Sequence, residues 1–196
     1  PMNLEEYKVL LEKSNNKIEI SKVKGRYAGN DSGSGAKQDL EFADFEQSGW
    51  LMFGHCKQGD QMWIVKAQHS SLVTENEGWE CVWDDRGSRK RREYAVWMPT
   101  HGNTNFKPLG VICMFRKDGY PEPKMKVAMV HKDILEESRA QSHVWRDKGT
   151  SATHDITLEK NLQLNSLWPT HLTKVKETTP RCWKINENYL LVSTLT

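Results

Sequence analysis

Apolar and polar residues alternate in three short segments that lie far apart in the chain. The apolar pairs are Leu40 and Phe42, Tyr94 and Val96, and Ile156 and Leu158. Successive side chains of a β-strand point to opposite faces, so each pair would face a core while its neighbours face solvent. The pattern therefore predicts three strands in equivalent positions.

A polar motif precedes each of these segments and indicates that they belong to an internal repeat. It consists of an Asp, a Gly two residues later, then a Ser or Thr, and an acidic residue five positions further on. The three copies are Asp31-Ser32-Gly33-Ser34 with Asp39, Asp85-Arg86-Gly87-Ser88 with Glu93, and Asp147-Lys148-Gly149-Thr150 with Asp155. A repeat of this length is one supersecondary unit that cannot bury its apolar face alone, so the copies must share a core.

Two further apolar segments follow each motif, so each repeat is expected to hold about four strands. They are residues 50–54 and 62–65, 106–111 and 125–130, and 167–169 and 182–185. Three such sheets around a common axis predict an all-β, β-prism-like fold with pseudo-threefold symmetry. We expect one domain over residues 1–196, with repeat units at about 27–78, 79–140 and 141–196.

Residues 1–26 precede the repeats and are expected to hold a short helix and a strand. Asn3 is a suitable N-cap for a helix through Lys13, with Glu6 at the third helical position. Residues 17–23 alternate as a strand would. We expect this strand to pair with residues 189–193, which would close the ring and protect a sheet edge.

Local chemistry explains the residue types in the motif. An Asp side chain can accept hydrogen bonds from backbone N–H groups, Gly supplies a positive φ, and the hydroxyl and second carboxylate can close further turn bonds. The turn is therefore either purely structural or also presents polar groups to a ligand. The candidate ligand-binding residues of the motif are Asp31, Ser34, Asp39, Asp85, Ser88, Asp147, Thr150 and Asp155. The spacing lacks the dense oxygen ligands of a calcium loop, so no metal or cofactor is predicted.

The second copy differs from the others in charge. Arg89, Lys90, Arg91 and Arg92 follow its turn, with Arg86 just before, whereas the other two copies are near neutral there. Because those copies lack the charges, we expect the fold not to need them. The cluster suits an anionic lipid head group, a sulfated glycan or nucleic acid. The alternative is a solvated loop partly neutralised by neighbouring acidic residues.

The motifs also resemble a known family. The second copy is similar to repeats of the vacuolar protein sorting-associated protein 62 family in its Trp-x-Asp-x-Gly-Ser turn at Trp83, its Trp-x-Pro step at Trp97 and its Leu-Gly step at Leu109. The turn also looks like that of the β-prism domain of multivesicular-body sorting subunits. The first copy has Gly29 where the leading Trp is expected. The resemblance covers about residues 27–185 and implies a β-prism-like fold with a link to membranes or glycans, and no catalytic residue.

Composition narrows the functional classes. The net charge of +2 argues against a dedicated nucleic-acid binder. The seven histidines are scattered, and neither a phosphate-binding loop nor a nucleophile motif is present, so we expect no enzyme. The four cysteines are widely spaced, which favours reduced thiols and a cytoplasmic protein, with secretion as the alternative. Eight tryptophans are mostly expected in the core, with Trp79 or Trp168 as candidates for an exposed ligand-stacking ring.

These observations favour a non-catalytic binding module that recognises a membrane surface or a glycan through loops at the ends of the prism. It would be peripheral to membranes, since no segment is long and apolar enough to span one. The alternatives are a protein-interaction adaptor in vesicle trafficking, which would bind a protein partner, and the targeting module of a pore-forming protein.

Overall fold

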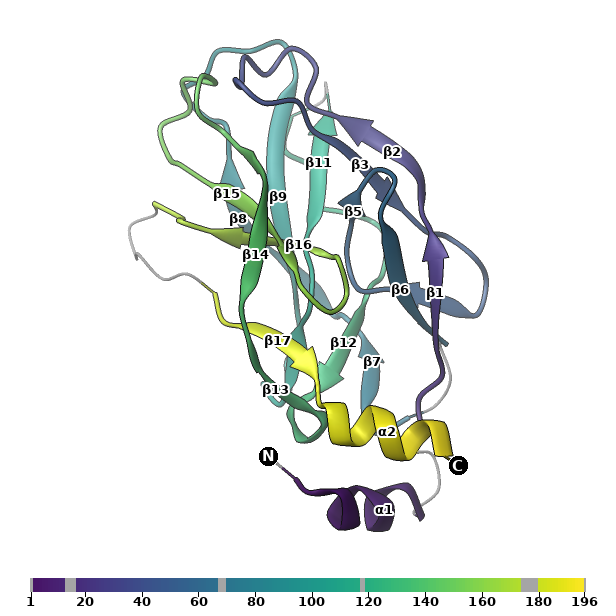
Figure 1. Ribbon diagram of the computed structural model, residues 1–196. Helices are drawn as coiled ribbons and strands as arrows, with labels where there is room; N and C mark the ends of the chain where they lie inside the picture. Colours follow the sequence, from purple (N-terminus) through teal and green to yellow (C-terminus); the bar gives the residue numbers. More distant parts are fainter. Residues whose placement is uncertain (1, 13–16, 67–69, 117–118, 174–179, 196) are drawn as a thin grey trace.

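The computed structural model describes residues 2–12, 17–66, 70–116, 119–173 and 180–195 of the chain. This described part holds seventeen short strands, two α-helices and one 3-10 helix, η1 (Lys132–Ile134). The strands form a tall body, and α1 (Leu4–Glu12) and α2 (Glu187–Leu195) lie together at one end, which we call the base (Figure 1). The all-β fold of β-prism type predicted from the repeat is confirmed.

The strands fall into three consecutive units. The first unit comprises β1 (Ile20–Lys24), β2 (Arg26–Asn30), β3 (Glu41–Asp44), β4 (Trp50–Met52), β5 (Cys56–Lys57) and β6 (Gln61–Lys66). The second comprises β7 (Val73–Glu75), β8 (Gly78–Asp84), β9 (Glu93–Thr100), β10 (Phe106–Pro108), β11 (Ile112–Arg116) and β12 (Ala128–His131). The third comprises β13 (Leu135–Ser138), β14 (Ala140–Arg146), β15 (Thr157–Asn161), β16 (Leu167–Thr170) and β17 (Cys182–Ile185).

Each unit repeats the same strand pairing. One antiparallel sheet carries the motif strands, in the orders β2-β3-β5, β8-β9-β11 and β14-β15-β16. A second antiparallel sheet joins the first and last strands of the unit, in the orders β1-β6-β4, β7-β12-β10 and β13-β17. The units thus hold more strands than the apolar pattern indicates, because strands as short as β5 leave too little alternation to recognise.

The three units meet inside the body where extended backbone segments come very close. A Cβ on Gly54 would lie 2.6 Å from the backbone nitrogen of Val111, and one on Gly110 would be equally close to a backbone oxygen of the first unit. The N–H of His55 donates to the carbonyl of Val111, and the N–H of Leu167 donates to the carbonyl of His55, both at 2.9 Å. Glycine is needed at such an approach because it has no Cβ, which explains the Leu-Gly step in the sequence.

Tryptophans from two units fill the core near the motif. Trp83 and Trp145 are buried, with ring centroids 5.8 Å apart in an edge-to-face arrangement. Phe115 packs against Trp145 at 5.9 Å. Trp168 is also buried, at 1% exposure, so its interpretation as an exposed ligand-stacking ring is wrong. Its indole N–H instead donates to the carbonyl of Pro180 at 3.1 Å.

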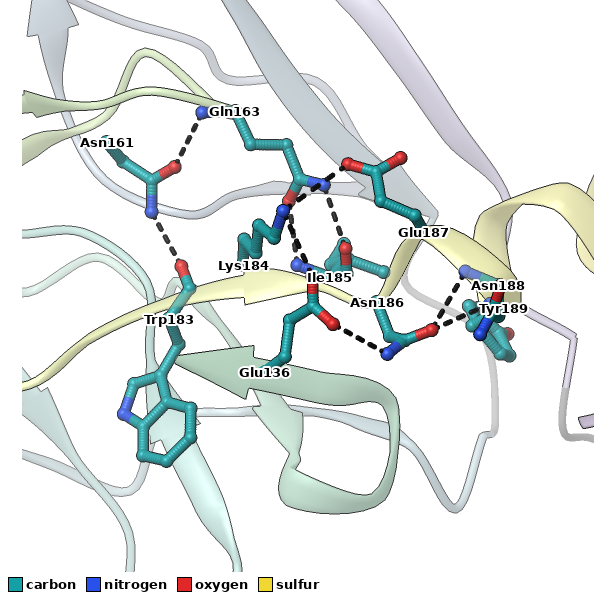
Figure 2. Close-up of polar contacts among 10 residues, drawn as sticks. All are labelled: Glu136, Asn161, Gln163, Trp183, Lys184, Ile185, Asn186, Glu187, Asn188 and Tyr189. Atoms are coloured by element: carbon teal, nitrogen blue, oxygen red, sulfur yellow. Dashed lines mark hydrogen bonds and ion pairs between the residues drawn. The ribbon is translucent and has the colours of Figure 1, made fainter. Parts of the chain in front are cut away.

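The prediction that residues 189–193 form a ring-closing strand is wrong, since they belong to helix α2. The partner assigned to them, β1, instead pairs with β6 of its own unit. Asn186 caps α2 by accepting hydrogen bonds from the N–H groups of Asn188 at 2.8 Å and Tyr189 at 3.3 Å (Figure 2). The cap and the burial of Tyr189 against Tyr7 of α1, at a ring distance of 5.7 Å, outweigh the strand propensity of the Leu-Leu-Val run.

Side chains also hold the segment before α2 in place. The amide of Gln163 bonds both to the N–H of Ile185 at 2.7 Å and to its carbonyl at 2.8 Å, as a neighbouring strand would (Figure 2). The Lys184 ammonium lies 3.0 Å from Glu136 and 3.8 Å from Glu187. At the other terminus, the predicted N-cap of α1 is confirmed by the hydrogen bond from Glu6 N–H to Asn3 at 2.9 Å; the expected last residue, Lys13, lies outside the described residues.

Candidate functional site

The three motif turns lie together at the end of the body opposite the base (Figure 1). They connect β2 to β3, β8 to β9, and β14 to β15. Backbone hydrogen bonds join neighbouring turns: Lys37 N–H donates to the carbonyl of Lys148 at 2.9 Å, and Thr153 N–H to that of Arg86 at 3.0 Å. We call this end, formed by residues 31–40, 85–94 and 147–156, the apex.

Each motif Asp closes its own turn. Its Oδ1 accepts a hydrogen bond from the backbone N–H nine residues later, at the start of the next strand. The pairs are Asp31 with Leu40 at 2.8 Å, Asp85 with Tyr94 at 3.0 Å, and Asp147 with Ile156 at 3.0 Å. All three carboxyl groups are buried. The structural role expected for the first motif position is therefore present in all three copies.

The hydroxyl position closes the turn in two of the three copies. Ser34 donates to Oδ2 of Asp31 at 2.9 Å, and Ser88 donates to Oδ2 of Asp85 at 2.6 Å. In all three copies the backbone N–H at this position also donates to the carbonyl of the motif Asp, at 2.9 Å. The hydroxyl of buried Thr150 accepts from the N–H of Ala152 at 3.2 Å. No hydrogen bond to Oδ2 of Asp147 is present in the described part of the chain.

The motif glycines have the backbone conformation expected of them. Gly33, Gly87 and Gly149 have φ values of +81°, +92° and +101°. The second motif carboxylates behave differently from the expectation that they accept from turn donors. Asp39 and Asp155 are exposed, and no turn N–H bonds to either side chain among the described residues.

Tryptophan indoles of the second and third units donate hydrogen bonds to the turn of another unit. The indole N–H of Trp145 donates to the carbonyl of Gln38 at 3.1 Å and to Oδ2 of Asp31 at 3.2 Å. The indole N–H of Trp83 donates to the carbonyl of His154 at 2.8 Å. Each Trp lies two residues before its motif Asp and reaches the turn of another unit. The first unit has Gly29 at this position and cannot make the third bond.

Arg92 makes the connection that Gly29 cannot. It occupies the turn position equivalent to Gln38 and His154, and its guanidinium donates to the carbonyls of Asn30 at 3.0 Å, Ser32 at 2.8 Å and Phe115 at 2.8 Å. The expectation that the fold does not need the charges of this loop is therefore wrong for Arg92.

The space of the missing indole is filled by neighbouring aromatic rings. A Cβ on Gly29 would lie only 2.6 Å from Cζ of Phe42, which occupies a position held by Val and Leu in the other units. The hydroxyl of Tyr94 donates to the carbonyl of Ser32. Tyr94 and Phe42 both pack against Phe115, with ring centroids 5.0 Å and 5.4 Å away.

The other basic residues of the loop remain available. Arg89 and Arg91 are exposed, and Lys90 is half-buried beside Gly35, whose Cβ would lie 2.8 Å from the Lys90 ammonium. Arg86 pairs with Asp84 at 3.4 Å and lies 5.0 Å from the centre of the Tyr120 ring. Two further exposed cations lie at the apex, Lys37 and Lys148; they could not be predicted from the sequence, because only the packing of the turns brings them close.

Two recesses flank the turns of the first and third units. The Asp31 recess has a volume of about 410 Å³ and includes Asn30, Asp31, Ser32 and Asp39 in its lining. The Asp147 recess has a volume of about 500 Å³, and its lining includes the following residues: Arg146, Asp147, Lys148, Asp155, His171 and Thr173. Both are formed by the motif Asp, the residues on either side of it, and the carboxylate eight positions later.

In the second unit, Tyr120 occupies the equivalent place. Its hydroxyl donates to Oδ1 of Asp85 at 2.8 Å and also bonds with Glu93. Burial and these two carboxylates raise the pKa of the Tyr120 phenol, which stays protonated. Tyr120 carries no motif signal and was missed in the sequence.

Buried titratable groups elsewhere have structural roles. Burial lowers the pKa of His55 to about 4, and its neutral ring accepts from the N–H of Cys113 at 3.0 Å through Nδ1 and stacks on Phe42 at 4.9 Å. Burial raises the pKa of the Cys56 thiol to about 12, which removes the reactive thiolate at neutral pH. No cluster of three metal-ligating side chains exists among the described residues.

Comparison with known proteins supports the fold. The structure is similar to the crystal structure of GNIP1Aa from Chromobacterium piscinae, with a TM-score of 0.75 and 24% sequence identity. The match covers 90% of this chain and 38% of that chain, so the present chain spans less than half the length of its neighbour. No protein-family model and no curated protein matches the chain. The resemblance to sorting proteins is therefore supported for a β-rich fold and not for membership of that family.

Proposed function

We propose that the protein is a non-catalytic binding module whose apex binds surfaces that carry dense phosphate or sulfate groups. Five cations from all three turns support this proposal, and none of them has an ion pair within the described part of the chain: Lys37, Arg89, Lys90, Arg91 and Lys148. Like charges gathered in this way repel one another, and an anionic partner would relieve that repulsion. This convergence of unpaired cations is the observation that carries the proposal.

The expected strength follows from the number of cations. Each Lys or Arg near an anionic membrane contributes about 1 kcal/mol, so five would contribute up to about 5 kcal/mol at low salt. The exposed carboxylates Asp39 and Asp155 lie at the same end and offset part of this attraction. Binding should weaken steeply as salt increases, because the Debye length falls from about 10 Å at 0.1 M to about 3 Å at 1 M.

The test separates the apical charges from the rest of the surface. In the variant R89S/K90A/R91T, the loop takes the residues of the third copy while Arg92 is kept, so the fold is retained. Its matched control removes three exposed lysines outside the apex, Lys24, Lys57 and Lys132. Binding is measured at low and high salt to heparin and to phosphatidylcholine vesicles with and without phosphatidylglycerol.

Loss of salt-sensitive binding in the apical variant, with the control unchanged, supports the proposal. Binding to heparin alone would assign the ligand to sulfated glycans, and binding to anionic vesicles alone would assign it to lipid head groups. Wild-type protein that binds neither surface at low ionic strength would refute the proposal.

A further inference from the structure

We propose that the Asp31 and Asp147 recesses each bind a neutral, hydroxyl-rich ring such as a hexopyranose, in the place that Tyr120 takes in the second unit. This inference goes beyond the proposed recognition of anionic surfaces and rests on the motif carboxylates; of the five apical cations, Lys148 also lines a recess. Three equivalent sites would thus exist in the fold, two of them open and the third closed by the chain itself.

Tyr120 shows what an equivalent site accepts. It contacts the motif Asp85, the following residue Arg86 and the carboxylate of Glu93. The residues at these three positions in the other units line the two recesses: Asp31, Ser32 and Asp39, and Asp147, Lys148 and Asp155. A hydroxyl group on a ring is therefore the group that the repeat already binds between its two carboxylates.

Unused hydrogen-bond acceptors remain in the open recesses. Oδ1 of Asp85 accepts two bonds, from Tyr94 N–H and from the Tyr120 hydroxyl. Oδ1 of Asp147 accepts only the backbone bond from Ile156, and its Oδ2 accepts none within the described residues. Oδ2 is not among the buried unpartnered atoms of that part of the chain, so it stays accessible at the recess. A carboxylate oxygen has two acceptor sites, and a ligand hydroxyl would take the place of water there.

The charges at the recesses select the class of ligand. The Asp31 recess is lined by three acidic residues, Asp31, Asp39 and Glu41, and by no Lys or Arg, so it would repel a phosphate, sulfate or sialic acid. In the Asp147 recess, Arg146 and Lys148 offset the charge of Asp147 and Asp155, and the two carboxylates act there as acceptors for hydroxyls of a neutral sugar. Asn30 and Ser32 at one recess, and Thr173 at the other, add further polar groups. In the second unit, the planar guanidinium of Arg86 lies over the Tyr120 ring. Ser32 holds the equivalent position in the first unit and has no planar group, so the Asp31 recess would bind an aromatic ring less well.

The test uses backbone amides beside the carboxylates as reporters. The N–H groups of Leu40 and Ile156 donate to the motif carboxylates of the open recesses, and that of Tyr94 donates to the closed one. ¹⁵N-labelled protein is titrated separately with glucose, galactose, mannose, N-acetylneuraminic acid and p-cresol. We expect a saturable response of Leu40 and Ile156 to a neutral hexose, and no response of Tyr94.

Variants then assign each response to its recess. Asp39→Ala and Asp155→Ala change exposed side chains and should weaken binding at least tenfold at their own recess only. Tyr120→Ala should open the third site, so that the Tyr94 amide begins to respond, whereas Tyr120→Phe keeps the ring and should not.

Several results would overturn the inference. These are the absence of any response to neutral hexoses, a response that survives Asp39→Ala and Asp155→Ala, or saturable binding of only p-cresol or N-acetylneuraminic acid. Binding of p-cresol would instead indicate a tyrosine-bearing partner, and binding of N-acetylneuraminic acid would indicate an anionic sugar. Hexose binding retained by R89S/K90A/R91T would show that the recesses act independently of the anionic-surface site.

Discussion

Replacing Arg92 with alanine removes a guanidinium that joins the first two units at the apex, where the Tyr94 hydroxyl also bonds to the first unit. The guanidinium donates to three backbone carbonyls, and no other side chain of its loop does so among the described residues. Its neighbour Arg91 is exposed and has no hydrogen bond or ion pair there. Arg91→Ala is therefore a matched control with the same change in charge.

The expected cost can be worked from the burial of the acceptors. The Ser32 carbonyl belongs to an exposed residue and also accepts from the Tyr94 hydroxyl, so losing the Arg92 donor leaves no unsatisfied acceptor there. The carbonyls of Asn30 and Phe115 belong to half-buried and buried residues, and an acceptor left unsatisfied costs about 1–3 kcal/mol. Because water reaches these two acceptors in part, the expected loss in the free energy of unfolding for Arg92→Ala is about 3 kcal/mol. In a chain of this length, this corresponds to a fall in Tm of about 6–12 °C.

The free energy of unfolding is measured by urea denaturation followed by tryptophan fluorescence, with Tm from calorimetry. Arg91→Ala should change stability by less than about 0.5 kcal/mol, as surface substitutions usually do. Arg92→Lys keeps the charge without the planar fork and should recover only part of the loss. An Arg92→Ala variant as stable as Arg91→Ala would refute the role assigned to Arg92.

Three further outcomes are expected. Gly149→Val should destabilise by about 1–3 kcal/mol in urea denaturation, because φ is +101° and the new Cβ would lie 2.5 Å from the carbonyl of Gly35; an unchanged midpoint would contradict this. The lowered pKa of His55 means that the unfolded state binds more protons, so the free energy of unfolding should fall by about 3 kcal/mol as pH drops from about 6.5 to about 4. His55→Gln should make the free energy of unfolding depend less on pH in this range, and equal pH dependence of wild type and variant would contradict the prediction. Native protein treated with iodoacetamide should leave Cys56 and Cys113 unmodified until urea is added, since burial raises the pKa of both thiols.

Much of the fold could be predicted because its determinants are local. The motif glycines, the turn Asp and the alternating strand that follows recur in each unit, and each acts within about ten residues. Residues 189–193 were misassigned because their composition suits a strand, whereas the cap at Asn186 and the contact with α1 decide for a helix. Tertiary contacts of this kind override propensity and are not visible in a single segment.

The candidate site was harder to predict because it depends on which turn lies beside which. Arg92 and Lys90 carry the same charge in neighbouring positions, yet only Arg92 bridges two units. A signal was present in the sequence: Gly29 stands where the other units have Trp, which leaves a gap that a neighbouring residue must fill. Tyr120 lies outside the motif altogether, and its role follows from packing alone.

The arrangement of the units makes the body a closed ring. Trp145 of the third unit binds the turn of the first at Gln38 in the same way that Trp83 of the second binds the third at His154. The first and last helices, α1 and α2, pack together at the base (Figure 1). A circular permutant that begins with the second unit and ends with the first would give every unit the same neighbours. The order of the units along the polypeptide is thus separable from their order around the axis.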